Sequence, residues 1–520
     1  MERKVLGHVT SPGNGIRTRR YWGVTLREEP RGRLRACLAF ALGLLIVAAT
    51  IQRERFGIPV ELDGPAVALL GILALFLAPA SFLRFWTLPL ILPMTGFVLA
   101  GYASCAANSG DLTSVVRSAT PLLNICIRQS AILTYRVIMF YVVFIAASHL
   151  TELRRKPPVI MLSVLLIQTI GSLAFLPLYP SPASELLVRG EQFGPGSLAL
   201  MGLFLEPNLF GIYAVTTVAL WMPIALSIDK KPALGWILAS IQVGIVGVFM
   251  SYTRSAWLAL IGVFLLLAAG VLLGMRVGGE RRRSVLLLLG VLVVLGFALS
   301  SAIALAASQA KRSPGVVETP SPGMVETPSP ALDEGPSPAL VERALRIVDF
   351  QTGSSGAGRI WVWGLALEEW ANKPWLGWGL LSFEPSGGPS TQGWLYSSLV
   401  QTLHDTGVVG LIFMVWLCVG VAVHTWRAFM LAGSQIDRGL ALGYLTAQVA
   451  LFFTSQFSSF FWGAPTWTLF GLAVAYGRLS SRKERGDGLV QGRRLADEAA
   501  APPEADHALI SPPSGVPGSG

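Results

Sequence analysis

The chain has 520 residues, of which 52% are hydrophobic and 13% are charged. Soluble domains carry roughly 25% charged residues, and the apolar residues here fall in blocks of about twenty, the length that crosses a bilayer as a helix. This composition excludes a soluble globular protein. The net charge of +10 does not indicate a nucleic-acid partner, because the basic residues cluster between the apolar runs, as topology signals do.

The apolar runs predict an all-α fold, a polytopic transmembrane bundle of about twelve helices, in one membrane domain at residues 34–477. The basic turns fall on the same side as the basic N-terminal arm, so both termini are expected in the cytoplasm. Arg53 and Arg55 are the exception to this pattern. The expected helices cover residues 34–51, 64–83, 85–107, 131–150, 158–179, 208–228, 234–252, 256–275, 285–306, 408–426, 440–457 and 462–476.

Three segments outside the helices have distinct compositions. Residues 1–33 form a cytoplasmic basic arm, and residues 478–520 are expected to be a disordered cytoplasmic tail. A large outer loop, residues 307–407, separates the ninth and tenth helices. Its first part, 311–338, repeats VETPSP and is rich in Pro and Ser, so it packs no core. Its second part, 345–407, is rich in Gly and Trp and is predicted to fold as a cap over a membrane-embedded site.

The four cysteines, Cys37, Cys105, Cys126 and Cys418, form no C-x-x-C pair. We therefore expect free thiols packed among helices, and neither a disulfide framework nor a zinc site. No nucleotide-binding phosphate loop, H-E-x-x-H or Asp-rich metal motif is present. The sequence predicts neither a metal nor a cofactor.

Two arginines near the expected outer face are candidates for binding an anion. Arg254 lies in SYTRSAW, where the hydroxyls of Ser251, Thr253 and Ser255 would suit a phosphate. Arg359 lies in GSSGAGRIWVW, where glycines and a helix start expose backbone N–H groups, and guanidinium groups bind phosphate through two parallel hydrogen bonds. Together they suggest a diphosphate. The alternative is that both arginines are merely interfacial.

Three residues could carry proton transfer. Glu206, in FLEPNLFG, could act as a base, bind a sugar hydroxyl or cap the helix that begins at Pro207. His404 and Asp405 lie in LVQTLHDTG, and histidine is the usual proton acceptor near neutral pH. A lone histidine in a loop is also commonly structural.

An outer-face site has no supply of ATP or nucleotide sugars, so its donor must be activated before it crosses the membrane. A lipid diphosphate meets this condition. Trp363 and Trp394 are candidates for stacking on sugar rings, although Trp is also enriched at membrane interfaces.

At these residues the chain resembles the O-antigen ligase and O-antigen polymerase superfamily. The third of four similar stretches carries the family pattern Gly-Arg-x-x-x-Trp followed by Pro-x-x-Gly-x-Gly. The four stretches are GLFLEPNLFG at 202–211, SYTRSAWLA at 251–259, SGAGRIWVWGLALEEWANKPWLGWG at 355–379 and SLVQTLHDTGVVGLI at 398–412.

The resemblance implies transfer of a glycan from undecaprenyl diphosphate to an acceptor hydroxyl, without a metal and with inversion, on the outer face of the bacterial inner membrane. It further implies that Arg254 and Arg359 bind the diphosphate and stabilise its charge as it leaves. The expected partners are a polyprenyl-diphosphate-linked glycan donor, a glycan or lipid-linked acceptor, the lipid bilayer and other polysaccharide-assembly proteins.

The chain departs from the family at one position. The family usually has a histidine eleven residues before the glycine that is here Gly407, but Tyr396 occupies that position and His404 follows eight residues later. The base therefore remains open among His404, Glu206 and Asp405, and Tyr396 joins the tryptophans as a candidate sugar contact.

Several functions share this scaffold. Polymerisation of polysaccharide repeat units is the favoured prediction, and ligation onto a lipid core or a protein is the alternative. A lipid-linked oligosaccharide flippase would be expected to show repeated halves with matching broken helices, and no such repeat is visible. A structural subunit of an export complex is the remaining reading.

Overall fold

The computed structural model describes residues 19–21, 24–26, 28–51, 62–79, 88–117, 120–150, 155–190, 197–228, 231–272, 280–311, 354–383 and 394–479. The expected Pro- and Ser-rich spacer, most of the N-terminal arm and nearly all of the C-terminal tail lie outside these residues.

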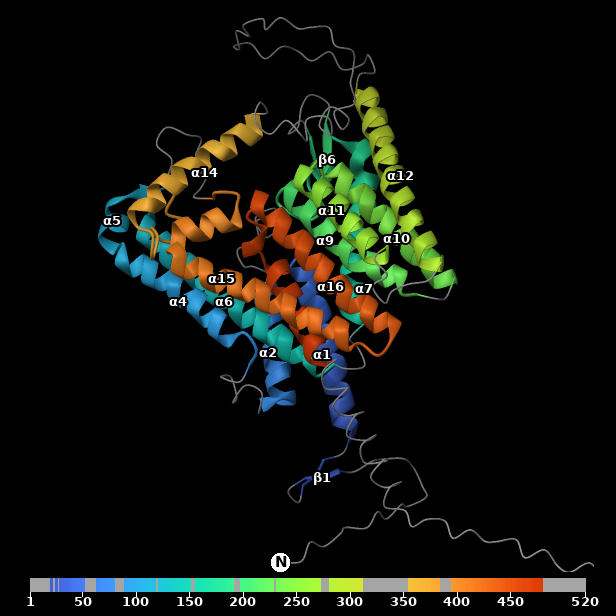
Figure 1. Ribbon diagram of the computed structural model, residues 1–520, viewed down its shortest axis with the longest axis horizontal. Coiled ribbons are helices and arrows are strands. Elements are labelled where there is room, and N and C mark those ends of the chain that lie inside the picture. The colour runs from blue at the N-terminus through green and yellow to red at the C-terminus, as the bar shows by residue number, and fades with distance from the viewer. Residues whose placement is uncertain are drawn as a thin grey trace, which may run out of the picture.

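The fold is all-α, as predicted (Figure 1). The long helices are α1 (Glu28–Ala48), α2 (Asp63–Leu77), α4 (Ile91–Ala107), α6 (Leu122–Ser148), α7 (Lys156–Phe175), α9 (Pro207–Leu226), α10 (Lys231–Met250), α11 (Arg254–Leu272), α12 (Glu280–Lys311), α14 (Ser354–Asn372), α15 (Ser398–Leu431), α16 (Gln435–Thr454) and a final helix over residues 464–479.

Short elements connect these helices. Three small antiparallel hairpins pair β1 (Arg19–Tyr21) with β2 (Val24–Leu26), β3 (Val116–Arg117) with β4 (Thr120–Pro121), and β5 (Val188–Gly190) with β6 (Leu198–Leu200). The short helices are α5 (Ser109–Ser114), α8 (Pro182–Glu185), η4 (Leu176–Leu178), η5 (Ser455–Phe457) and η6 (Phe460–Trp462).

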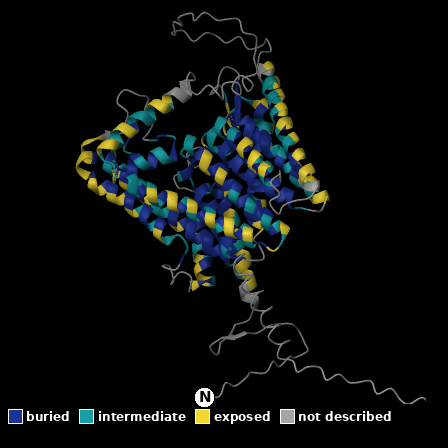
Figure 2. Ribbon diagram, viewed as in Figure 1, coloured by how far each residue is buried: buried dark blue, intermediate teal, exposed yellow. Residues whose placement is uncertain are grey.

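Within the described residues, eight helices are long and apolar enough to cross a membrane. Their outward faces expose large apolar side chains, such as Trp236 at 79% and Val294 at 68%, and Figure 2 shows exposed residues along α12, α4 and α15. Water would penalise such surfaces, whereas lipid tails cover them. The chain is therefore a multi-pass membrane protein.

The centre of the bundle is α9, which α7, α10, α11 and α16 all contact. In its most apolar 18-residue stretch, 94% of the residues are buried inside the bundle. Gly443 of α16 packs directly against the carbonyl of Leu220, and Thr446 donates a hydrogen bond of 2.7 Å to the carbonyl of Ala219. Small residues that let helix backbones approach closely are typical of membrane helix pairs, so α16 packs closely against the second half of α9.

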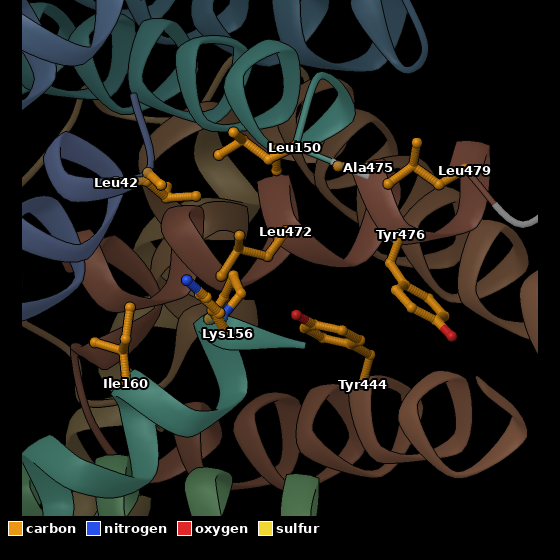
Figure 3. Close-up of a pocket in the computed structure, with 12 residues that line it drawn as sticks. Leu42, Leu150, Lys156, Ile160, Tyr444, Leu472, Ala475, Tyr476 and Leu479 are labelled. Carbon is orange, nitrogen blue, oxygen red and sulfur yellow. The ribbon is translucent and has the colours of Figure 1, made fainter. Parts of the chain in front are cut away.

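A small pocket lies between α1, α7, α16 and the final helix. Leu42 of α1, Lys156 at the start of α7 and Leu479 of the final helix line it, and Figure 3 shows the Tyr444 hydroxyl pointing into this space. Its volume of about 40 Å³ has room for roughly three waters, too few for a saccharide. In Figure 1 this region lies on the side of the bundle away from α14.

The prediction of free cysteines is wrong for Cys105 and Cys126, which form a disulfide with a Cα–Cα distance of 5.9 Å. The prediction failed because it placed the start of α6 too late in the chain. This helix begins at Leu122 rather than near residue 131, so LLNICI is helical and its cysteine faces the end of α4. Cys37 and Cys418 are free.

We expect a thiol-specific maleimide, added to the denatured protein without reductant, to label Cys37 and Cys418 alone. Cys105 and Cys126 should react only after reduction, because their sulfurs are bonded to each other. Peptide mass spectrometry reads each cysteine separately, and labelling of all four before reduction would contradict the disulfide.

Candidate functional site

The turn before α11 carries Arg254 and packs on the start of α9. Tyr252 has a positive φ of 54°, a conformation that costs non-glycine residues free energy and is common at functional sites. The Thr253 hydroxyl donates to the carbonyl of Pro207 at 3.3 Å. A side chain at Gly211 would collide with this turn. The glycine therefore lets the two segments that carry Glu206 and Arg254 meet.

The hydroxyls in this turn are already engaged. Ser251 donates to the carbonyl of Val248 at 2.7 Å, and both Ser251 and Thr253 are buried. Their hydrogen bonds fix the turn that carries Arg254. The suggested contact of these two hydroxyls with phosphate therefore has no support in this geometry.

Glu206 stands immediately before α9, with Pro207 at the first helical position. Its backbone carbonyl accepts from Leu209 and Phe210, but its side chain makes no capping hydrogen bond. The Glu206 side chain therefore does not cap α9, which was one of its three predicted roles.

Arg359, in α14, lies with its guanidinium 5.7 Å from the ring centre of Tyr396. Burial lowers the pKa of Arg359, and the nearby positive charge of Arg254 lowers this pKa further. Tyr396 and Glu206 act on it in the opposite direction. Arg254 of α11, Glu206 at the start of α9 and Tyr396 before α15 thus all lie within electrostatic range of Arg359 in α14.

Tyr396 holds an unusual position beneath Arg359. Its φ is 51°, and burial raises the pKa of its phenol, with Glu206 raising it further. The phenol therefore stays protonated and can donate a hydrogen bond. Like charges at Arg254 and Arg359 repel unless an anion lies between them, and perturbed groups of this kind are typical of binding sites. The cluster of Glu206, Arg254, Arg359 and Tyr396 is called the arginine cluster below.

His404 and Asp405, both buried, form a second polar group with the partly exposed Glu369. His404 is 1% exposed; its Nδ1 is 2.9 Å from Asp405 and its Nε2 is 3.1 Å from Glu369 of α14. Phe383 packs against the ring edge to face at 5.3 Å. Both ring nitrogens already have protein partners, so this histidine ties α14 to α15.

Asp405 also holds the loop that follows α14. Its Oδ2 accepts from the backbone N–H of Leu381 at 2.9 Å and from Gln401 at 2.6 Å. Leu381 itself has a positive φ of 57°. The Asp405 carboxylate therefore fixes a strained loop position.

The glycines of the Pro-x-x-Gly-x-Gly pattern close this loop onto a break in α15. Gly407 has φ 64° and ψ −167° inside the helix, which frees the carbonyls of His404 and Asp405. They accept from the N–H groups of Trp378 and Gly379, both at 2.9 Å. A helix does run on from residue 408, where the tenth helix was expected to begin, but a helical segment from Ser398 precedes the break at Gly407. The loop supplies the hydrogen bonds that the break removes.

Gly377→Ala is expected to lower the melting temperature of the detergent-purified protein by several degrees. Gly377 has φ 64°, and an added Cβ would collide with the carbonyl oxygen of His404. Strain of this kind costs about 1–3 kcal/mol before the collision is counted. Gly364→Ala in α14 is the matched control, because open space surrounds that position and alanine favours helix. Equal melting temperatures for both variants would contradict the interlocked loop.

The tryptophans divide between structural and cavity positions. The Trp363 indole donates to the carbonyl of Leu395 at 2.7 Å and holds the segment before α15 under α14. Trp394 lines a cavity of about 680 Å³. Of the two tryptophans expected to stack on sugar, Trp394 is therefore the one at a cavity wall.

This cavity lies between α6, the ends of α1 and α2, and the turn before the final helix. Its polar lining includes Arg128, Arg136, Asp63, Asn124 and Gln129, none of which the sequence analysis singled out. The sequence did contain a signal for Arg136, because an arginine in a membrane-length apolar helix costs free energy and is usually functional. The expected helix began at residue 131, which left Arg128 in a loop.

Residues 239–415 match the family model of the O-antigen ligase. This segment belongs to the O-antigen ligase superfamily. No curated protein matches the chain. The matched O-antigen ligase domain includes Arg254, Arg359, Tyr396 and His404, whereas Glu206 and the α6 wall of the cavity precede it. Glycosyltransferase-type activity of the O-antigen ligase or polymerase kind, on lipid-linked glycans in a membrane, follows from this family.

Proposed function

We propose that the protein is a membrane glycosyltransferase that moves a glycan from undecaprenyl diphosphate to an acceptor hydroxyl and so polymerises polysaccharide repeat units. One observation supports this most strongly: Arg254 and Arg359 bring like charges together beside Glu206 in an O-antigen ligase domain. Two guanidinium groups exceed the single carboxylate beside them, and a diphosphate would supply the further negative charge.

In the proposed reaction, the bond between the anomeric carbon and the diphosphate oxygen breaks as the acceptor oxygen bonds to that carbon from the opposite face. The two guanidinium groups stabilise the charge that develops on the leaving diphosphate. The acceptor proton passes to a carboxylate, and no metal is required. Tyr396 donates a hydrogen bond to a diphosphate or sugar oxygen.

We assign the base to Glu206. Its carboxylate is near Arg359 and Tyr396 in electrostatic terms and is not used for capping. His404 and Asp405 are both 1% exposed and engaged with protein groups. In this assignment His404 and Asp405 position the loop and α14.

The outer face of the inner membrane is the proposed location of the arginine cluster, with both termini in the cytoplasm. Disulfides persist in oxidising compartments such as the periplasm. Cys126 accepts a hydrogen bond from Leu380 of the loop that follows α14, so the disulfide and the cap share one end of the bundle. That end would then face the compartment in which only a pre-activated donor is supplied.

Polymerisation is proposed over ligation onto a lipid core, because Tyr396 replaces the histidine of the common ligase pattern. Deleting the gene should leave single glycan units on polyprenyl diphosphate in the outer leaflet, where an impermeant lectin added to spheroplasts reaches them. Units trapped in the inner leaflet would indicate a flippase. Long chains that stay on the lipid carrier would indicate a ligase.

A further inference from the structure

The small pocket at the end of the bundle away from α14 has an almost wholly apolar lining (Figure 3). Of the described residues that line it, Lys156 alone is charged, and Tyr444 and Tyr476 are the others with polar side chains. Polar groups that are surrounded by hydrocarbon cost free energy unless they have polar partners. The partners of these three side chains therefore decide whether the pocket is a binding site.

Among the described residues, only one of the two tyrosine hydroxyls has a hydrogen-bond partner. Tyr476 donates to the carbonyl of Asp437 at 2.9 Å. Tyr444 is 1% exposed and its ring packs against Tyr476, but its hydroxyl makes no hydrogen bond within the described ranges. Figure 3 shows the two hydroxyls pointing in opposite directions, that of Tyr444 into the pocket. Because a buried hydroxyl without a partner is destabilising, Tyr444 is expected to bind a group held in the pocket.

Lys156, in the first turn of α7, supplies the positive charge of the pocket. Within the part of the chain that the structure describes, no ion pair joins its ammonium group. Its neighbour Arg155 differs, because its guanidinium lies 3.8 Å from the buried carboxylate of Asp437. That pair is neutral, so the pocket keeps one net positive charge and favours an anion.

The pocket borders the lipid-facing surface of the bundle. Ala39 and Leu42 of α1 line it, and Phe40 between them is 71% exposed. On α7, Ile160 lines it, and Val159 beside it is 48% exposed. The volume of about 40 Å³, or roughly three waters, suits a phosphate group and leaves acyl chains to lie outside, along the exposed apolar residues of α1 and α7.

Basic residues gather at this end of the bundle. Arg33 and Arg35 lie in the first half of α1, before its pocket-lining residues, and Arg155 and Lys156 lie at the start of α7. In the proposed orientation this end faces the cytoplasm. The cytoplasmic leaflet carries anionic lipids, and basic pockets between membrane helices bind the headgroups of such lipids.

We propose that this pocket binds an anionic phospholipid of the cytoplasmic leaflet. The Lys156 ammonium and the Tyr444 hydroxyl donate to its phosphate oxygens, and its acyl chains lie against α1 and α7. The lipid joins four helices at the end of the bundle opposite α14. This site is independent of the proposed glycan transfer, because none of its lining residues belongs to the arginine cluster.

Lipid binding to the full-length protein tests this site. The protein is purified in detergent, freed of lipid and titrated with phosphatidylglycerol, and native mass spectrometry counts the bound lipids. We expect one phosphatidylglycerol to bind more tightly than the rest. Tyr444→Phe and Lys156→Gln should each weaken the binding of this lipid by about tenfold to a hundredfold, the range for a lost hydrogen bond to a charged group.

Both variants should fold without lipid. Tyr444→Phe removes an oxygen to which no described residue forms a hydrogen bond, and Lys156 is exposed. Two matched controls should bind phosphatidylglycerol as tightly as the unaltered protein does. Tyr476→Phe removes a hydroxyl that points away from the pocket, and Lys231→Gln removes an exposed lysine at the start of α10 that does not line it.

Two further ligands identify the chemistry that the site recognises. Phosphatidylethanolamine adds an ammonium group beside Lys156 and should bind at least about tenfold more weakly at the tight site. Inorganic phosphate is the arm without lipid; if it displaces phosphatidylglycerol at equal concentration, the ligand is a free anion and the proposal is wrong. Equal binding of phosphatidylglycerol by Tyr444→Phe, Lys156→Gln and both controls would also overturn it, and the pocket would then hold only water.

Discussion

Arg359→Gln is expected to lower the rate of glycan transfer by about a hundredfold to a thousandfold, the usual effect of removing one group that stabilises developing charge. The side chain is held beside Tyr396 and within electrostatic range of Arg254 and Glu206. Among the described residues Arg359 forms no ion pair that the fold would lose, so the abundance of the variant in the membrane should not fall. The rate is measured with purified protein and a lipid-linked glycan extracted from the source cells.

Two further variants sharpen this result. Arg359→Lys keeps the charge but loses the planar fork that binds two phosphate oxygens, so an intermediate rate is expected. Arg189→Gln removes an exposed arginine that belongs neither to the arginine cluster nor to the cavity beside α6. This variant should transfer at the normal rate. Transfer by Arg359→Gln at the rate of this control would show that the arginine cluster does not hold the leaving group.

Glu206→Gln is expected to lower kcat by about a hundredfold to ten-thousandfold, the usual contribution of a positioned general base. Glutamine has nearly the same shape and cannot accept the acceptor proton, so substrate binding should persist. Glu206 makes no capping hydrogen bond, and the helix should therefore remain folded.

His404→Gln provides the contrast. Its ring lies between Asp405 and Glu369 in a space that is 1% exposed, so we expect a lower melting temperature before any specific loss of kcat. If His404→Gln instead abolishes transfer with an unchanged melting temperature while Glu206→Gln remains active, the base is the histidine and our assignment is wrong.

The helices were largely predictable because their cause is local. Apolar runs of membrane length must form helices in lipid, where backbone groups have no water partners. The expected helices at residues 208–228 and 234–252 correspond closely to α9 and α10. The expected start of α6 was wrong because Arg128 and polar neighbours resemble a loop when read without the cavity they face.

The break in α15 could not be read from the sequence, because it depends on contacts distant in the chain. Gly407 looks like a helix start until the loop at 374–379 supplies the replacement hydrogen bonds. The disulfide also depends on contacts that are distant in the chain. Cys105 and Cys126 are separated by 21 residues, and only the packing of α4 on α6 brings them together.

The candidate site was partly predictable. Positive charge at Arg254 and Arg359 was evident from position and neighbours, and the two residues do act on each other electrostatically. The burial of His404 and the engagement of Thr253 were not, because a side chain's partners depend on the packed bundle. Glu369 contacts the Nε2 atom of His404. Nothing in the sequence distinguished it from other acidic residues.

The most direct measurement places the purified protein in liposomes with the lipid-linked glycan and follows the lipid product. Our account predicts that free polyprenyl diphosphate appears in a ratio of one to each glycan transferred, without added nucleotide, and that Arg359→Gln stops both. Movement of intact lipid-linked glycan between leaflets, with no free polyprenyl diphosphate released, would contradict it.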